Sequence, residues 1–177
     1  SKDHRFDCRD LVITTCITDM ADNETTIENN TSIDTTAPTA DIDIKTKAND
    51  AGWYNDDIQF ETSAYDATSG IESVTYTVTA PDGSVIGDAD RAVTFSDFEK
   101  GNGSADGSFV IKRSDSPLYD YGALVITTTT RDVAGNETKK SKTINVDTTK
   151  PDAELVGDDG ANKDGWHNQK VDFTLNV

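Results

Sequence analysis

The stretch "DIQFETSAYD" (Asp57–Asp66) carries the pattern that decides the fold. Every second residue from Ile58 through Phe60 and Thr62 to Ala64 is apolar or small, and the residues between them are polar or acidic. Successive side chains of an extended chain point to opposite sides, so a period of two is typical of a strand with one buried and one solvated face. The stretch therefore predicts a β-strand over residues 57–65.

The same alternation extends outward in "IESVTYTVTA", "GALVITTTTRD" and "KTINVD", with Gly-, Asp- and Pro-rich turn signals such as "PDGS" between the runs. The expected strands are residues 39–46, 57–65, 71–79, 84–94, 107–113, 122–132 and 138–147. Seven short alternating strands in one segment of this size predict an all-β protein, an antiparallel β-sandwich of immunoglobulin-like type. Another two-sheet sandwich with different connections is the alternative.

Phrases of the sequence return at one constant spacing. "IDTTAP" begins at Ile33 and its counterpart "VDTTKP" at Val146, while "LVITT" occurs at Leu11 and at Leu124. Residues 1–64 align with 114–177 without a gap and with 23 identities. The chain is therefore expected to be a tandem repeat, with a unit of about 113 residues that suits a single small sandwich domain.

The repeat divides the chain into three parts. Residues 1–36 are expected to be the C-terminal part of one unit plus a linker, 37–149 a complete unit, and 150–177 the N-terminal part of a third. Neither partial piece holds enough strands to bury a core alone, so we expect the sequence to be a window on a longer chain.

The chain is strongly acidic, with 33 Asp and Glu against 16 Lys and Arg and a formal net charge of −17. Such a surface repels nucleic-acid phosphates and anionic lipids, so we expect neither as a partner. No run of about 20 apolar residues predicts a membrane-spanning helix. Cys8 and Cys16 lie roughly 26 Å apart on an extended strand, too far for a disulfide between them.

Three quoted stretches carry a resemblance to a family: "DTTAPTADI", "GWYNDDIQFETSAYDATSGIESVTYTV" and "LVITTTTRDVAGNETKKSKTINVDTTKP". The chain is similar to the bacterial immunoglobulin-like repeats of large secreted and surface-anchored proteins, including adhesins. The resemblance implies a sandwich fold and an extracellular or cell-surface location. One turn departs from the pattern, because Asp22 stands where Gly135 stands one unit later; Asp tolerates the left-handed conformation, so we expect that turn to survive.

Acidic turns offer residues for a candidate cation site. In an immunoglobulin-like topology the incoming linker and the turns at 66–70 and 132–137 meet at one end of the sandwich. Ca²⁺ binds six to eight oxygens from carboxylates, amides and carbonyls. Asp34, Asp66, Asp132 and Asn136 can supply such a set between units, with Glu72 and Glu137 in reserve. The alternative is that these residues serve only turn geometry.

No catalytic site is expected. His4 and His167 do not recur between units, and no nucleophile-elbow or phosphate-binding motif is present. Trp53 and Trp166 do recur, and we expect Trp53 to pack over the sandwich edge beside Gly52; an exposed platform for sugar stacking is the alternative.

The expected function is structural: a spacer or stalk repeat of a bacterial cell-surface or secreted protein, projecting a functional region and serving in adhesion. Neighbouring repeats of the same chain are its expected partners. The linker motif Asp-Thr-Thr-x-Pro predicts a short, stiff joint, because proline cannot continue a central strand. The alternatives are a module that binds a glycan or a host protein and an accessory domain of an extracellular hydrolase.

Overall fold

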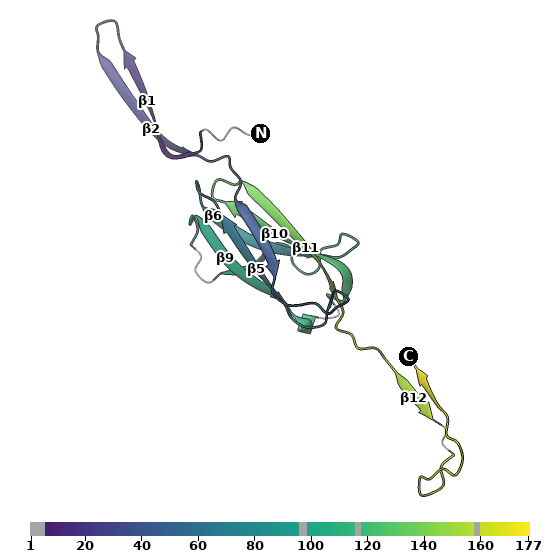
Figure 1. The fold of residues 1–177 in the computed structure, drawn as a ribbon. Coiled ribbons are helices and arrows are strands. Elements are labelled where there is room, and N and C mark those ends of the chain that lie inside the picture. Colours follow the sequence, from purple (N-terminus) through teal and green to yellow (C-terminus); the bar gives the residue numbers. More distant parts are fainter. Residues whose placement is uncertain (1–5, 96–98, 116–117, 158–159) are drawn as a thin grey trace.

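The structure is a computed structural model that describes residues 6–95, 99–115, 118–157 and 160–177. It is an all-β protein, in which a central sandwich lies between two β-hairpins (Figure 1). The strands are β1 (Cys8–Thr18), β2 (Glu24–Ile33), β3 (Thr39–Ile44), β4 (Trp53–Tyr54), β5 (Ile58–Tyr65), β6 (Ile71–Thr79), β7 (Arg91–Ala92), β8 (Thr94–Phe95), β9 (Ser104–Ile111), β10 (Tyr121–Asp132), β11 (Glu137–Val146), β12 (Glu154–Gly157) and β13 (Phe173–Asn176). One short 3₁₀ helix, η1 (Arg113–Asp115), precedes β10.

Two sheets form the central sandwich. One has the strand order β3-β5-β9-β8 and the other β4-β11-β10-β6-β7. Among the described residues of the sandwich, the strand pairings are antiparallel except the short contact of β4 with β11, which is parallel. Antiparallel strands can have one buried and one solvated face, which is what the alternating sequence requires.

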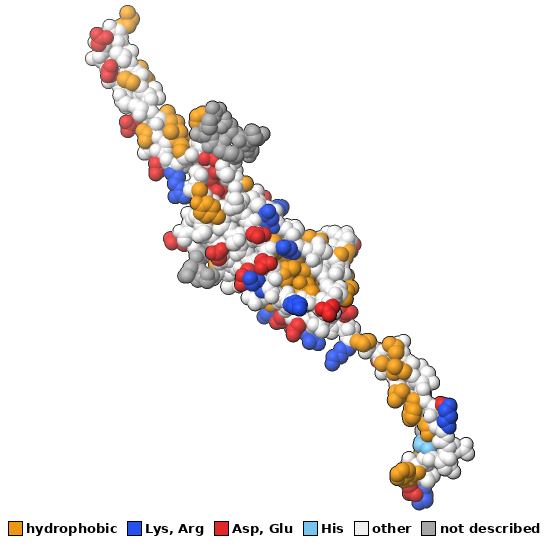
Figure 2. Space-filling view, in the orientation of Figure 1, with side chains coloured by type: hydrophobic (Ala, Val, Ile, Leu, Met, Phe, Trp, Pro, Cys, Tyr) orange, Lys and Arg blue, Asp and Glu red, His pale blue; other side chains and the backbone are white. Residues whose placement is uncertain are grey.

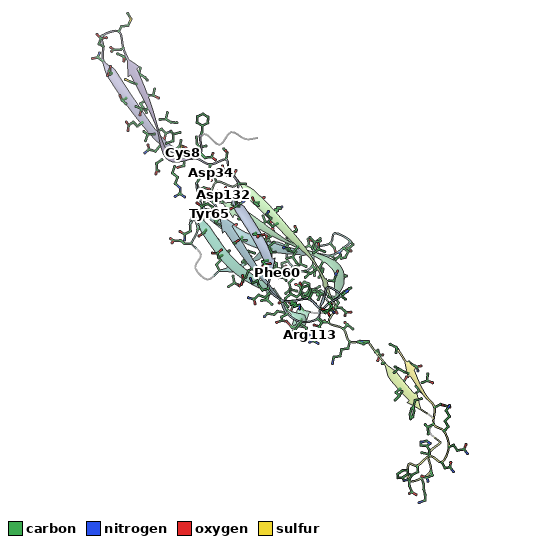
Figure 3. All side chains as sticks on the ribbon, viewed as in Figure 1. Cys8, Asp34, Phe60, Tyr65, Arg113 and Asp132 are labelled. Carbon is green, nitrogen blue, oxygen red and sulfur yellow. The ribbon has the colours of Figure 1, made fainter. Side chains whose placement is uncertain are left out.

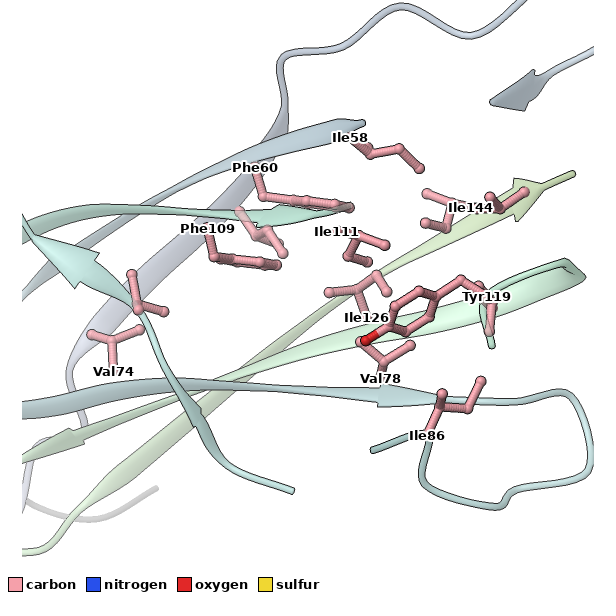
Figure 4. Close-up of a cluster of buried hydrophobic side chains, with 14 of the residues drawn as sticks. Ile58, Phe60, Val74, Val78, Ile86, Phe109, Ile111, Tyr119, Ile126 and Ile144 are labelled. Carbon is pink, nitrogen blue, oxygen red and sulfur yellow. The ribbon is translucent and has the colours of Figure 1, made fainter. Parts of the chain in front are cut away.

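The core fills the space between these sheets (Figure 4). Strand β5 is buried at every second residue, from Ile58 at 0% exposure to Ala64 at 5%, as its alternation predicts. Phe109 of β9 lies between two other rings, with centroid distances of 4.8 Å to Phe60 and 3.9 Å to Tyr76. This aromatic stack joins the two sheets, since Phe60 and Phe109 belong to one and Tyr76 to the other.

The sequence predicts six of the central strands within a few residues, but the prediction of a strand over 84–94 is wrong. That segment holds only an isolated bridge at Val85 and the two-residue strands β7 and β8. Gly87 and Asp90 break it, because both have positive φ, at 71° and 51°. The short edge strand β4 was not predicted.

Arg91 holds the irregular segment against the core. Its guanidinium lies 4.9 Å from the centroid of the Tyr76 ring and donates hydrogen bonds to the Tyr119 hydroxyl at 2.6 Å and the Ile86 carbonyl at 2.9 Å. Burial raises the pKa of Tyr76, and the nearby Arg91 charge opposes this shift. Side-chain contacts therefore replace a regular strand here.

The N-terminal hairpin and the last hairpin of the sandwich have matching registers after a shift of 113 residues along the sequence. Leu11 of β1 faces Thr31 of β2, and Leu124 of β10 faces Ile144 of β11. Both pairs also have a register irregularity just before the leucine. Residues that lie 113 positions apart in these two hairpins thus have the same local structure.

The C-terminal hairpin repeats the beginning of the sandwich in the same way. Leu155 of β12 faces Leu175 of β13, and Ile42 of β3 faces Thr62 of β5. The environments differ: Leu175 is 62% exposed, whereas Thr62 is 5% exposed. Figure 2 shows hydrophobic side chains on the surface of both hairpins.

The aromatic stack gives a test of the core. We expect Phe109→Ala to lower the free energy of unfolding by about 3–5 kcal/mol, because it removes a buried ring and leaves a cavity. Val110→Ala is the matched control: its side chain is 40% exposed, and a loss within about 0.5 kcal/mol is expected. Urea unfolding followed by circular dichroism measures both. Equal losses in the two variants would contradict this packing.

Candidate metal centre at the linker

Three stretches far apart in the sequence meet at the end of the sandwich that faces the N-terminal hairpin. They are the linker 34–38, the turn 66–70 after β5 and the turn 132–136 between β10 and β11. Figure 3 shows Asp34 and Asp132 at this end. The Val133 amide donates to the Gly70 carbonyl at 3.0 Å, so the two turns contact each other directly. The sequence-based expectation that these stretches meet is confirmed.

Asp66 organises its own turn. Its Oδ1 accepts hydrogen bonds from the backbone amides of Thr68, Ser69 and Gly70, at 3.1, 2.9 and 2.8 Å. An aspartate that binds the amides ahead of it is the typical reason for this residue in a turn. Its carboxylate is thereby fixed in a buried position, at 3% exposure.

Gly70 is required where it stands. Its φ is +80°, and a Cβ atom built there would lie 2.1 Å from the carbonyl oxygen of Gly101. The chain passes close because the Gly101 amide donates to the Ile71 carbonyl and the Ile71 amide to the Asn102 carbonyl, both at 2.8 Å. Any larger residue would displace the turn that holds Asp66.

Asp132 is held by its own turn and has 0% exposure. Its carboxylate accepts from the Asn136 backbone amide and from the Asn136 side-chain nitrogen, both at 2.8 Å. The same arrangement occurs at Asp19 and Asn23 in the N-terminal hairpin, at 2.9 and 2.8 Å. There the hydrogen bonds from Asn23 lower the pKa of Asp19.

The Asp19 turn has the same shape as the Asp132 turn, although Asp22 stands where the Asp132 turn has Gly135. Asp22 has a φ of 63° where Gly135 has 93°. The Asp22 amide donates to the Asp19 carbonyl at 3.1 Å, and the Gly135 amide to the Asp132 carbonyl at 3.2 Å. The expectation that this turn survives the substitution is confirmed.

Asp34 joins the linker to both turns. Its Oδ2 accepts from the Ser69 amide at 3.0 Å, and its carbonyl accepts from the Asn136 side-chain nitrogen at 3.3 Å. Four residues later, the Pro38 carbonyl accepts from the Thr138 hydroxyl at 2.5 Å. The linker is thus bonded to the sandwich at both of its ends.

The carboxylates of Asp34, Asp66 and Asp132 converge, with one oxygen of each within 4.8 Å of the others. Oxygens bound to one Ca²⁺ at about 2.3–2.6 Å lie up to about 5 Å apart, so the spacing fits a single ion. All the converging groups are hard oxygen donors, which suits Ca²⁺. The three carboxylates together with nearby backbone carbonyls are the residues that can hold it.

The convergence is electrostatically unfavourable without a cation. Two like charges at this separation repel each other by about 3–4 kcal/mol at an effective dielectric constant of about 20. Within the described residues, no Lys or Arg forms an ion pair with any of the three. Backbone amides offset part of the repulsion, but they carry no full charge.

The other predicted ligands have different positions. Asn136 belongs to the cluster, but its amide nitrogen faces Asp132, so it orients that carboxylate. Glu72 pairs with Lys100 at 2.6 Å, and hydrogen bonding from Lys100 lowers the pKa of Glu72. Glu137 pairs with Arg131 at 3.0 Å. The two reserve carboxylates therefore bind lysine and arginine.

Sequence reasoning missed two residues at this joint. Asp7, just before β1, accepts hydrogen bonds from the linker threonines Thr35 and Thr36. Arg9 donates from its Nε to the Thr68 carbonyl in the Asp66 turn. The signal for the first was present, because Asp7 recurs as Asp120 among the 23 identities.

The remaining candidates are apart from this centre. Trp53 is 39% exposed in the edge strand β4, and its ring lies near Gly122 of β10. Trp166 is 75% exposed. Cys8 and Cys16 form no disulfide with each other.

Two further expectations concern catalysis and membranes. His4 lies outside the described residues, and His167 is exposed in the loop between β12 and β13. In the described parts of the chain, no helix has the length and apolar character needed to cross a bilayer.

Comparison with known proteins gives no assignment. No protein-family model matches the chain, and no curated protein is significantly similar to it.

The charge balance gives a test with two readouts. Asp66→Asn keeps the Oδ1 acceptor for the turn amides but removes one charge. We expect the variant to lose Ca²⁺ affinity at least tenfold in calorimetry. Without calcium, its Tm should rise by about 4 °C per kcal/mol of relieved repulsion, the value where the ranges for small and for larger domains meet.

The matched control is Asp106→Asn, an exposed carboxylate on β9 outside the cluster. It should change neither Ca²⁺ affinity nor Tm appreciably. A wild-type protein that takes up no calcium at millimolar concentration, with Asp66→Asn no more stable than wild type, would contradict the electrostatic account.

Proposed function

We propose that this chain is part of a spacer or stalk of a large bacterial surface or secreted protein. In this proposal, immunoglobulin-like sandwich units follow one another at the spacing of the sequence repeat and project a functional region, as in adhesion. Residues 37–149 are one complete unit. Residues 1–36 end the unit before it, and 150–177 begin the unit after it.

The observation that carries the proposal is the matching register of the hairpins. β1–β2 pairs as β10–β11 does, and β12–β13 pairs as β3–β5 does, each after the same shift along the sequence. The turn Asn49–Trp53 also has its counterpart in Asn162–Trp166: the Asn side chain accepts from the Trp amide at 2.9 and 3.0 Å. Repetition of local structure over both flanks supports a row of equivalent units.

The exposed apolar side chains of the hairpins fit this proposal. Leu11 is 36% exposed in β1, whereas its counterpart Leu124 is fully buried. Phe173 is 62% exposed in β13, whereas its counterpart Phe60 is fully buried. Burying such side chains against further strands is the strongest driving force for completing each unit.

A Ca²⁺ ion at Asp34, Asp66 and Asp132 would stiffen the joint. One of these carboxylates comes from the linker and the other two from the following sandwich. A cation shared among them neutralises their repulsion and ties the linker to the sandwich end. Stiff joints are what a stalk needs, since a chain of flexible joints shortens its reach.

A module that binds a glycan or a host protein is the second candidate. The feature that favours it is a hollow of about 380 Å³ on the outer face of β3, β5 and β9. Among the described residues, its lining holds four carboxylates (Asp41, Asp43, Glu61 and Asp106) and no aromatic side chain. Glycan recognition commonly relies on ring stacking, so the stalk is the better-supported function. An accessory domain of an extracellular hydrolase has no specific support in the described residues.

Fusions of the complete unit test the stalk. Two, three and four copies of residues 37–149 in tandem recreate the junction Asp-Thr-Thr-Ala-Pro, because each copy ends with Asp147–Thr149. Small-angle X-ray scattering should show a maximum dimension that grows by about 35–45 Å per copy, the length of strands of roughly ten to twelve residues.

The control fusions carry a Gly/Ser stretch of equal length at each junction. Their dimension should grow less than linearly, as expected of flexible joints. If the natural and the Gly/Ser fusions grew alike, the stiff stalk would be refuted.

A further inference from the structure

Asp7, just before β1, and Asp120, just before β10, each accept hydrogen bonds from a linker of this chain. Asp7 Oδ1 accepts from the amide and the hydroxyl of Thr35, both at 2.9 Å, and its Oδ2 accepts from the Thr36 hydroxyl. Because β1 pairs with β2 from Cys8 to Ile33, Asp7 lies beside the point where the chain leaves β2. One carboxylate thus satisfies three donors of the linker.

The second linker has the same arrangement. Asp120 Oδ1 accepts from the amide and the hydroxyl of Thr148, both at 3.0 Å, and its Oδ2 accepts from the Thr149 hydroxyl at 2.7 Å. The first residue of each linker then closes a local turn: Asp34 Oδ1 accepts from the Thr36 amide and Asp147 Oδ1 from the Thr149 amide, both at 3.0 Å.

A β-bulge lies near the start of β1 and of β10, the two strands that these aspartates precede. The register shifts between Cys8 and Leu11 in the first case and between Tyr121 and Leu124 in the second. Within the bulges, Asp10 and Ala123 both have a φ of 58°.

Each bulge amide is bonded to the partner strand. The Asp10 amide donates to the Ser32 hydroxyl at 3.2 Å, and the Ala123 amide to the Asn145 side-chain oxygen at 2.7 Å. The bulge occurs at both places although Asp10 in one corresponds to Ala123 in the other. The backbone conformation that positions Asp7 and Asp120 is therefore the same.

We infer that Asp7 and Asp120 are joint-positioning residues. The hydrogen bonds of each carboxylate to two linker threonines, here called a clamp, hold the outgoing linker on the unit that precedes it. The linker therefore moves with the preceding unit, and Asp34 is presented to the following sandwich in a fixed direction. The cation centre is then assembled by two units, with Asp7 acting on it only through the linker. This inference rests on the proposed function for its role in a stalk.

The first test measures, without any metal, how far the Asp120 carboxylate restricts the motion of the linker. In the full chain, Asp120→Ala should speed hydrogen exchange of the Thr148 amide at least tenfold and lower the ¹⁵N order parameter of Thr149 from about 0.85 to below about 0.6. Asp152→Ala, which removes a charge beyond the clamp, is the matched control and should change neither. Continued protection of core amides such as that of Ile126 verifies folding in every variant.

The second test measures how loss of the Asp7 carboxylate changes Ca²⁺ binding at Asp34, Asp66 and Asp132, with Ca²⁺ alone as the probe. Asp7→Ala should weaken Ca²⁺ binding at least tenfold, while Asp120→Ala should leave it unchanged, because the second clamp is at the other end of the sandwich. Asp7→Asn, which keeps one acceptor oxygen, should recover part of the loss.

The outcomes separate the two ideas. An unchanged Thr148 exchange rate in Asp120→Ala, or equal Ca²⁺ affinities in Asp7→Ala and wild type, would overturn the clamp while leaving the stalk intact. A wild-type chain with slow exchange at Thr148 but no Ca²⁺ binding would support the clamp and remove the cation from the proposed function.

Discussion

The convergence of three carboxylates at the end of the sandwich is the constraint on which the joint depends. Asp66 and Asp132 are buried there, and Asp34 of the linker reaches the same point. Each has a structural reason to be in place, since the turns use their oxygens as acceptors. Their meeting within 4.8 Å is not explained by turn geometry alone, because an aspartate can close a turn without facing two others.

The joint is bonded in both directions. Asp7 fixes the linker threonines to the hairpin that precedes them, and Thr138 and Ser69 fix Pro38 and Asp34 to the sandwich that follows. A short linker held on both sides leaves few free dihedral angles, which lowers the entropy that the chain gains by bending there. The hydrogen bonds of the linker therefore restrict how the N-terminal hairpin and the sandwich move relative to each other.

Sequence patterns predicted what depends on periodicity. Alternation from Ile58 to Ala64 predicted the buried face of β5. The expectation that the linker meets the turns at 66 and 132 predicted the place where Asp34, Asp66 and Asp132 converge. Side-chain bonds that replace regular structure were not predicted. Residues 84–94 have no alternating pattern and form no continuous strand. Arg91, stacked on Tyr76 and bonded to the Ile86 carbonyl, holds this segment in place instead. Asp7 recurs at the repeat spacing, but recurrence alone does not reveal which donors a carboxylate accepts from.

The most direct test of the account is a crystal structure of the chain grown in calcium, with data collected for the anomalous signal of the metal. The account predicts one peak about 2.3–2.6 Å from a carboxylate oxygen of each of Asp34, Asp66 and Asp132. The same three carboxylates converging with no anomalous peak at millimolar calcium, or turned apart from one another, would contradict it.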